Sequence, residues 1–305
     1  MSKAFFRAAA LIAFLAGFGA MAQPDAAQAQ SPDSLVQPFS GPQLSPGQSL
    51  PNQPGQPPAL PDGIAPDPAH LVPPAPAAIL RPLTLARPVV VELFTAEGCA
   101  TCPTADQNLA ALAQRRDLLA LSYHVDYWDY TGWRDRFARP DHAVRHRAYT
   151  QAMGDNMVYT PQILVAGALP VLGSDRVAIE TALREARNRK VMAEPVLTKD
   201  GAGDIALHLP AMPLKVPATL WLVTFSHRVE SDVTAGENEG RRLVSINTVR
   251  SIRKLGQWHG QRLVQSIRLT DQERAAAPDG CAIIANEVEF GPVVAAGAWH
   301  VADLQ

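Results

Sequence analysis

Residues 89–103 read VVVELFTAEGCATCP. The run from Val89 to Phe94 is apolar and β-branched, which is typical of a buried strand. A helix is predicted to begin near the two cysteines. Its buried face would consist of residues at helical spacing, namely Ala105, Leu109 and Leu112. The segment therefore predicts a strand, a turn and a helix, with a Cys-x-x-Cys pair at the start of the helix.

The pair Cys99 and Cys102 has a spacing that brings both sulfurs within bridging reach on one helix face. Unpaired amides and partial positive charge at a helix N-terminus stabilise a thiolate, which is the nucleophilic form of cysteine. Pro103 fits an early helical position because no amide donor is needed there. We expect Cys99 to be the exposed attacking thiol and Cys102 to be the resolving thiol.

Three interpretations of this cysteine pair remain open. It can be a redox dithiol, or a structural disulfide in an exported protein. It can also be a metal site completed by His124, His142 or His146. The chain has no second Cys-x-x-Cys motif and no His-x-His cluster, either of which would favour the metal site, so no metal ligands are assigned and no cofactor is predicted.

Polar and aromatic residues follow the second predicted strand, Leu118 to Val125. The carboxyl ends of parallel strands meet at one edge of a sheet, so His124 and Asp126 should face the cysteines. They are candidates for assisting proton transfer, or for a structural hydrogen-bonded pair. Trp128 is a candidate for the rim of a substrate site, and the favoured alternative is packing in the core or in a loop.

Two further features belong to this predicted site. Thr160-Pro161 precedes the third predicted strand, where thioredoxin-like proteins hold a cis-proline beside the cysteine pair. This resemblance implies a cis peptide bond here, with the backbone of Thr160 holding a substrate chain. Glu97 lies close to Cys99 in the sequence, and a nearby carboxylate raises the pKa of a thiol.

The rest of the first half predicts a helix over 141–153, strands over 163–166 and 169–172, and a helix capped by Ser174. Together with the first two strands, this order is that of a thioredoxin-like α/β domain. After Pro195 the pattern changes to strands separated by turns. These strands are expected at Asp204–Leu209, Thr219–Arg228, Leu243–Val249, Leu263–Leu269, Cys281–Glu287 and Val293–His300.

The predicted fold class is therefore an α/β thioredoxin-like domain, residues 87–193, followed by a mostly antiparallel, sandwich-like β domain, residues 194–305. Cys281, in an apolar strand, should be a buried free thiol. Residues 236–241 form a polar loop between two of the predicted strands.

The N-terminal part has the pattern of an export signal and a linker. Residues 1–29 have a short basic start, an apolar stretch from Ala8 to Ala20, and cleavage options near Ala22 and Ala29. Residues 30–86 are expected to be a disordered linker, because 17 of the 27 prolines lie at or before Pro88. The pattern indicates a periplasmic or secreted protein with no membrane segment in its mature form.

Composition narrows the functional classes. The chain has 305 residues and a formal net charge of -2, which argues against nucleic-acid binding, since that needs a strong basic excess. Its three cysteines allow at most one internal disulfide.

Several short motifs together resemble a bacterial secreted, thioredoxin-like family known as domain of unknown function twelve-twenty-three. The resemblance covers about Pro88 to the C-terminus. The motifs are Val91-Glu92-Leu93-Phe94-Thr95, Gly98-Cys99-x-x-Cys102-Pro103-x-x-Asp106, His124-Val125-Asp126-Tyr127-Trp128-Asp129, Gly132-Trp133, Tyr159-Thr160-Pro161-Gln162, Gly173-Ser174 and Gly236-Glu237-Asn238. The resemblance implies a thioredoxin-like part followed by a β-rich part, and no known substrate. The chain departs from the family pattern at Glu239, where a basic residue is expected.

These observations predict a thiol-disulfide oxidoreductase that acts through Cys99 and Cys102. Its partners would be a protein or peptide disulfide and a periplasmic redox partner. One alternative is a non-enzymatic periplasmic binding protein braced by a Cys99–Cys102 disulfide. Another is a copper carrier that uses cysteine and histidine ligands.

Overall fold

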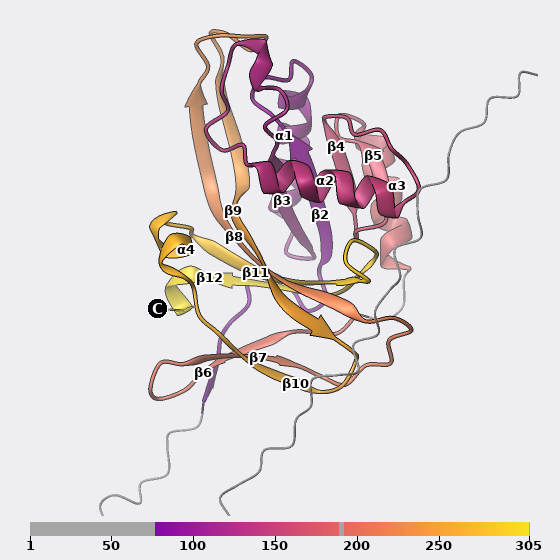
Figure 1. Ribbon diagram of the computed structural model, residues 1–305, viewed down its shortest axis with the longest axis vertical. Coiled ribbons are helices and arrows are strands. Elements are labelled where there is room, and N and C mark those ends of the chain that lie inside the picture. Colours follow the sequence, from indigo (N-terminus) through magenta and orange to yellow (C-terminus); the bar gives the residue numbers. More distant parts are fainter. Residues whose placement is uncertain (1–76, 189–191, 305) are drawn as a thin grey trace, which may run out of the picture. The chain divides into compact units, whose positions relative to one another are not determined.

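Two β-sheets form most of the fold (Figure 1). The structure is a computed structural model that describes residues 77–188 and 192–304. The first sheet is mixed and has eight strands, in the order β12-β11-β8-β9-β3-β2-β4-β5. The second has four antiparallel strands, in the order β1-β6-β7-β10. The expected signal peptide, residues 1–29, and residues 30–76 of the expected linker lie outside the described residues.

The first half of the described chain follows the predicted order of elements. Its strands are β1 (Ala78–Ile79), β2 (Val89–Thr95), β3 (Leu118–His124), β4 (Gln162–Val165) and β5 (Leu169–Leu172). Its helices are α1 (Cys102–Ala113), α2 (Pro140–Ala152) and α3 (Arg176–Arg187). The parallel pairing of β2 with β3 and the hairpin of β4 with β5 are confirmed. Asp175, rather than Ser174, caps α3, because its carboxylate accepts from two backbone amides.

The second half is mostly strand, as predicted, with one short helix. The strands are β6 (Val196–Lys199), β7 (Ile205–Leu209), β8 (Ala218–Asp232), β9 (Arg242–Trp258), β10 (Leu263–Ile267), β11 (Gly280–Glu287) and β12 (Val293–His300). The helix α4 (Asp271–Ala275) was not predicted, although Thr270 and Glu273 form a capping box at its start. Strands β1 and β6 were also missed, and β1 lies within the expected linker range 30–86.

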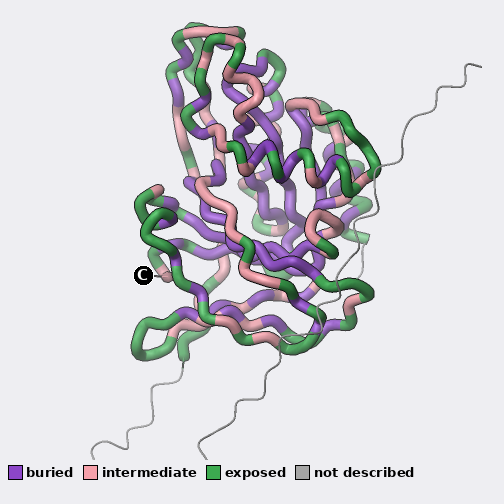
Figure 2. Tube along the Cα trace, viewed as in Figure 1, coloured by how far each residue is buried: buried purple, intermediate pink, exposed green. Residues whose placement is uncertain are grey.

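The predicted fold class is wrong. The described residues contain twelve strands and only four α-helices, and strands from both halves share one sheet. The connection is made by β9, which pairs in parallel with β3 at Ser122 and Thr248. Every residue of β3 is buried (Figure 2), and β3 has a neighbouring strand on each edge. Strand β2 covers one edge of β3 and the long β9 covers the other, so the β-rich half is not a separate sandwich.

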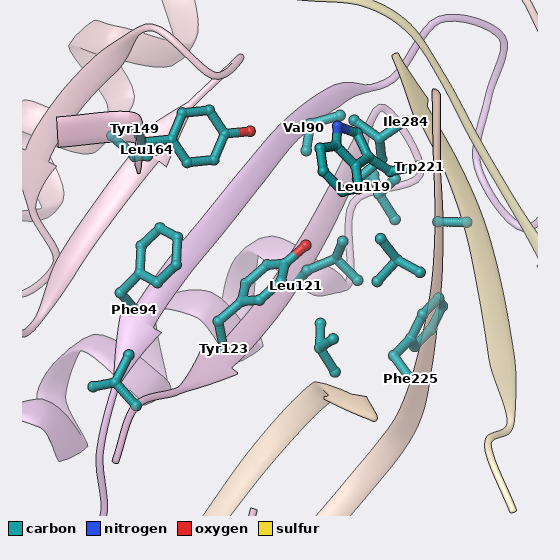
Figure 3. Packing of buried hydrophobic residues seen from close by; sticks show 14 of the residues in the cluster. Val90, Phe94, Leu119, Leu121, Tyr123, Tyr149, Leu164, Trp221, Phe225 and Ile284 are labelled. Atoms are coloured by element: carbon teal, nitrogen blue, oxygen red, sulfur yellow. The ribbon is translucent and has the colours of Figure 1, made fainter. Parts of the chain in front are cut away.

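One hydrophobic core also spans both halves (Figure 3). Phe94 of β2 and Tyr123 of β3 belong to the same buried cluster as Trp221 and Phe225 of β8. Within this core, Glu92 and Arg145 form an ion pair at 2.9 Å, and both side chains are almost fully buried.

No helix within residues 77–188 and 192–304 has the length and apolar character needed to cross a membrane.

Candidate functional site

The cysteine pair lies where β2 gives way to α1. Cys99 and Cys102 form a disulfide, with 5.4 Å between their Cα atoms, and Cys102 is the first residue of α1. Pro103 follows in the first turn of the helix, as predicted. The pair therefore lies beside the carboxyl end of β2, which is the position that the sequence predicted.

The expected exposure of Cys99 is wrong. Cys99 is 2% exposed and Cys102 is fully buried. The backbone at Gly98 is covered by the segment after β3, because a Cβ added at Gly98 would lie 2.8 Å from Thr131 Oγ1 and 3.1 Å from the carbonyl oxygen of Trp128. The burial therefore comes from packing partners that lie far from the cysteines in the sequence.

A second cover comes from the loop between β8 and β9, residues 233–241, which we call the hairpin tip. Asn238 of the hairpin tip is buried, and its Nδ2 donates to the carbonyl oxygens of Glu97 and Cys99 at 2.8 and 2.9 Å. Glu237 accepts a hydrogen bond from the backbone amide of Ala100 at 3.2 Å. In Figure 1, β8 and β9 extend beside β3 toward the end of the sheet where α1 begins. The hairpin tip is thus bonded directly to the turn that carries the disulfide.

A buried histidine–aspartate pair lies at the end of β3. His124 Nδ1 is 2.6 Å from Asp135 Oδ2, and both side chains are buried. Burial opposes protonation of His124. The carboxylate of Asp135 outweighs that effect, with help from Asp106 and Glu97, and raises the pKa of His124 to about 9. The imidazolium is therefore the form held at neutral pH. The partner of His124 is Asp135, not Asp126.

Glu97 joins the same buried cluster. Its backbone amide donates to Asp135 Oδ2 at 2.9 Å, and its carboxylate accepts from Trp133 Nε1 at 2.7 Å. Burial, reinforced by the negative charge of Asp135, raises the pKa of Glu97 above its usual value. Glu97 thus adds a second carboxyl group beside the imidazolium of His124.

Asp106 is the titratable residue of α1 that lies one turn beyond Cys102. At this spacing the two side chains project from one helix face. Asp106 Oδ2 accepts from Thr95 Oγ1 at 3.3 Å, whereas its buried Oδ1 has no partner among the described residues. Burial raises the pKa of Asp106 to about 7, against the opposing effect of His124. Asp106 can therefore change protonation state near neutral pH.

Two of the predicted substrate-binding residues meet in the structure. Trp128 Nε1 donates to Thr160 Oγ1 at 2.6 Å, and the Thr160-Pro161 peptide bond is cis, as predicted. The ring of Trp128 stacks on that of Tyr130 with 6.0 Å between centroids, and Tyr130 is 80% exposed. Trp128 itself is half-buried, and its carbonyl oxygen and Cβ lie beside Gly98, which immediately precedes Cys99.

Most of the donor atoms considered for a metal site have other partners, whereas the buried Nε2 atoms of His124 and His142 have none among the described residues. The cysteines are bonded to each other. His142 Nδ1 donates to the carbonyl oxygen of His124, and both ring nitrogens of His146 have partners. One ligand atom each of Glu97, His124 and Asp135 lies within 4.8 Å of the others. Among these three side chains, His124 and Asp135 are hydrogen-bonded to each other, and the Glu97 carboxylate is bonded to Trp133. Cys281 is a buried free thiol, as predicted, and burial raises its pKa to about 12.

Sequence reasoning missed three contributors to the site. Asp135 has no motif that marks it, and only the fold brings it to His124. Asn238 and Glu237 lie in the loop over residues 236–241 that the sequence singled out, but their contact with the cysteine turn could not be foreseen from spacing. The Gly236-Glu237-Asn238 motif was the feature of the sequence that could have marked this loop as part of the site.

Comparisons with solved structures identify two similar chains. Protein AGR_C_4864 from Agrobacterium tumefaciens, known from a crystal structure, has a TM-score of 0.59 and 27% identity, over 70% of this chain and 93% of that one. HBP35 of Porphyromonas gingivalis has a TM-score of 0.46 and 13% identity, over 71% of this chain and 76% of that one. Among curated proteins, none matches this chain.

A family match agrees with the motifs that the sequence and the structure single out. The family described as protein of unknown function (DUF1223) matches residues 90–286, which include the disulfide, the His124–Asp135 pair and the hairpin tip. This chain belongs to that family.

Proposed function

We propose that the protein is a thiol-disulfide oxidoreductase that acts on protein disulfides outside the cytoplasm. The observation on which the proposal rests is the Cys99–Cys102 disulfide at the junction of β2 and α1. A disulfide closed over four residues constrains little of the unfolded chain, because its stabilising effect grows with the length of the loop. Stabilisation alone is therefore a weak reason for this pair. The export pattern of residues 1–29 suggests a compartment in which disulfides persist.

The proposed reaction balances as a dithiol-disulfide exchange. In the reduced protein, the Cys99 thiolate attacks a substrate disulfide, forms a mixed disulfide and releases one substrate thiolate. The Cys102 thiolate then attacks the Cys99 sulfur, which closes the Cys99–Cys102 disulfide and releases the second substrate thiolate. Two electrons and two protons pass to the substrate. A periplasmic dithiol protein would return the pair to its reduced form.

The buried groups near the pair support the proton transfers of this exchange. Asp106, on the same face of α1 as Cys102, has an unpartnered carboxylate oxygen and a pKa of about 7. It can accept the Cys102 proton when that thiol becomes a nucleophile. The positive charge on His124, held by Asp135, favours nearby thiolates. The role of Asp106 is proposed from its position on α1, and the role of His124 from its positive charge.

One observation favours a second candidate function. Both cysteines are buried, and this is the condition expected of a disulfide that only braces a binding protein. In that case the ligand surface would be the stacked rings of Trp128 and Tyr130 together with the hairpin tip.

Turnover of a dye-labelled disulfide peptide tests the oxidoreductase proposal. The wild-type protein and Cys281→Ser, which removes only the distant buried thiol, should reduce the peptide at equal rates in the presence of a dithiol. Cys99→Ser should be inactive, and Cys102→Ser should accumulate a mixed disulfide that mass spectrometry detects. Equal inactivity of wild type and Cys99→Ser across several disulfide partners would support the brace instead.

A further inference from the structure

A threonine stands between the two cysteines, at the residue before α1. Thr101 occupies the N-cap position, where a threonine hydroxyl ordinarily accepts a hydrogen bond from an amide in the first turn of the helix. Its hydroxyl makes no such bond. The backbone of Thr101, with φ -93° and ψ -9°, is helical rather than extended, and Pro103 has no amide to offer. The hydroxyl of Thr101 is therefore not used to cap α1.

The hydroxyl instead contacts the sulfur of Cys99. Thr101 Oγ1 lies 3.6 Å from Cys99 Sγ, which is within hydrogen-bonding range for sulfur. A sulfur in a disulfide carries no hydrogen, so the hydroxyl is the donor and Cys99 Sγ is the acceptor. The contact thus gives a neutral donor to the sulfur that would attack a substrate.

The surroundings of Cys99 make this donor significant. Among the described residues, Thr101 is the only one that donates a hydrogen bond to either sulfur of the pair. The amide of Ala100, the next residue after Cys99, donates to the carboxylate of Glu237 at 3.2 Å. That carboxylate is negatively charged and opposes a thiolate nearby. Stabilisation of a Cys99 thiolate by direct contact therefore depends on Thr101.

We propose that the Thr101 hydroxyl stabilises the Cys99 thiolate and so makes Cys99 the more nucleophilic of the two cysteines. A hydrogen bond to an anionic sulfur is stronger than one to the neutral sulfur of a disulfide. The contact therefore stabilises the reduced, ionised form more than the oxidised form. The hydroxyl keeps its proton throughout, because it acts as a donor and not as a base. This inference rests on the proposed function for its part in the exchange, and it adds a residue that touches the reacting sulfur.

The ultraviolet absorbance of the thiolate, measured against pH in the reduced protein, tests this inference. The oxidised protein is the blank, which removes the absorbance of tyrosine. Cys281 does not contribute near neutral pH, because burial raises its pKa to about 12. In Thr101→Val, which replaces the hydroxyl by a methyl group of similar size, the midpoint of the first thiolate transition should rise by about one pH unit, which is about a tenfold smaller thiolate fraction. The same curves with Cys102→Ser assign this midpoint to Cys99.

Two further variants separate the hydrogen bond from general effects of substitution. Thr101→Ser keeps a hydroxyl at the same position, so its midpoint should stay close to that of the wild type. The matched control is Thr104→Val, which alters an exposed threonine in the first turn of α1 that has no hydrogen bond to either sulfur in the described structure. Its midpoint should be unchanged. Circular dichroism reports the folding of each variant, and if Thr101→Val does not fold, Thr101→Ala, which also lacks the hydroxyl, takes its place.

The inference is overturned if the midpoint of Thr101→Val equals that of the wild type, or if the midpoint of Thr101→Ser or Thr104→Val rises as far as that of Thr101→Val. The titration needs no disulfide substrate. A failure of the peptide turnover assay therefore leaves its result intact, and a failure of the titration leaves the turnover result intact, so the two proposals fail separately.

Discussion

Asn238 Nδ2 donates to the carbonyl oxygen of Cys99 at 2.9 Å, although 139 positions separate the two residues in the sequence. The same Nδ2 also donates to the carbonyl oxygen of Glu97. One side chain of the hairpin tip is therefore bonded to the backbone on both sides of Gly98. Any partner that reaches the disulfide must therefore approach past the hairpin tip or displace it. The second half of the chain takes part in the disulfide site through this contact.

Removing the Asn238 amide should make the disulfide easier to reach. Asn238→Ala leaves two carbonyl oxygens without their donor, which costs about 1–3 kcal/mol and loosens the hairpin tip. Reduction of the Cys99–Cys102 disulfide by a small dithiol should accelerate roughly tenfold, because local opening becomes more frequent. Stopped-flow thiol detection measures this rate. Glu239→Ala, an exposed neighbour on the same tip, is the control and should not change it. An unchanged rate in Asn238→Ala would mean that the hairpin tip does not limit access.

Two glycines of the hairpin tip form a matched pair. Gly236 and Gly240 both have a φ of 77°, so alanine is strained to a similar degree at either position, by about 1 kcal/mol. Only at Gly236 would the new Cβ meet neighbours, the Thr131 carbonyl oxygen at 3.2 Å and Trp133 Cβ at 3.3 Å. Gly236→Ala should therefore lower the free energy of unfolding by about 1 kcal/mol more than Gly240→Ala does. Urea denaturation of both variants measures the difference. Equal losses would show that the tip is not closely packed there.

The buried pair of His124 and Asp135 should make stability depend on pH. The pKa of His124 is raised from 6.5 to about 9 on folding, so its contribution is fully present below pH 6.5 and is lost as the pH rises to about 9. The loss should be on the order of 3 kcal/mol. Asp135→Asn should remove this slope, and burial should then hold His124 neutral. NMR titration of the His124 ring follows the proton directly. A wild-type ring that titrates near its ordinary pKa would contradict this account.

Removing only one partner of the Glu92–Arg145 ion pair should strongly lower the free energy of unfolding. Glu92 and Arg145 are buried, and Tyr149 hydrogen-bonds to both of them. Arg145→Met leaves the Glu92 carboxylate buried without its cation, which should cost about 3–5 kcal/mol. The double variant with Glu92→Leu should recover much of that loss. A double-mutant cycle from denaturation curves measures the coupling. Additive losses would show that the two side chains do not depend on each other.

The local elements of the cysteine half were predictable, because strand, turn and helix are encoded within short windows. The apolar runs of β2 and β3 and the helical spacing of α1 are features of this kind. Pairings between distant segments were not predictable. No periodicity in the sequence predicts that Thr248 lies beside Ser122. This single pairing joins the two halves into one sheet. The fold class was misjudged for that reason.

The same limit applies to the site. Cys99, Cys102 and the cis bond before Pro161 were foreseen from motifs. His124 was placed near the cysteines, but Asp126 was chosen as its partner because it is close in sequence. The carboxylate that bonds to it belongs to Asp135, within the loop between β3 and α2, whose conformation no local rule sets. The burial of Cys99 beneath the hairpin tip was likewise a tertiary effect that overrides the usual exposure of a helix start.

The reduction potential of the Cys99–Cys102 disulfide tests the central claim most directly. It is measured by equilibrating the protein with glutathione or dithiol buffers and quantifying the free thiols, with Cys281→Ser to remove the third cysteine from the count. A working oxidoreductase should give a potential clearly above about -300 mV, in the range of known dithiol enzymes. A potential below about -300 mV is typical of structural disulfides. That result would contradict the proposed function and identify the pair as a brace.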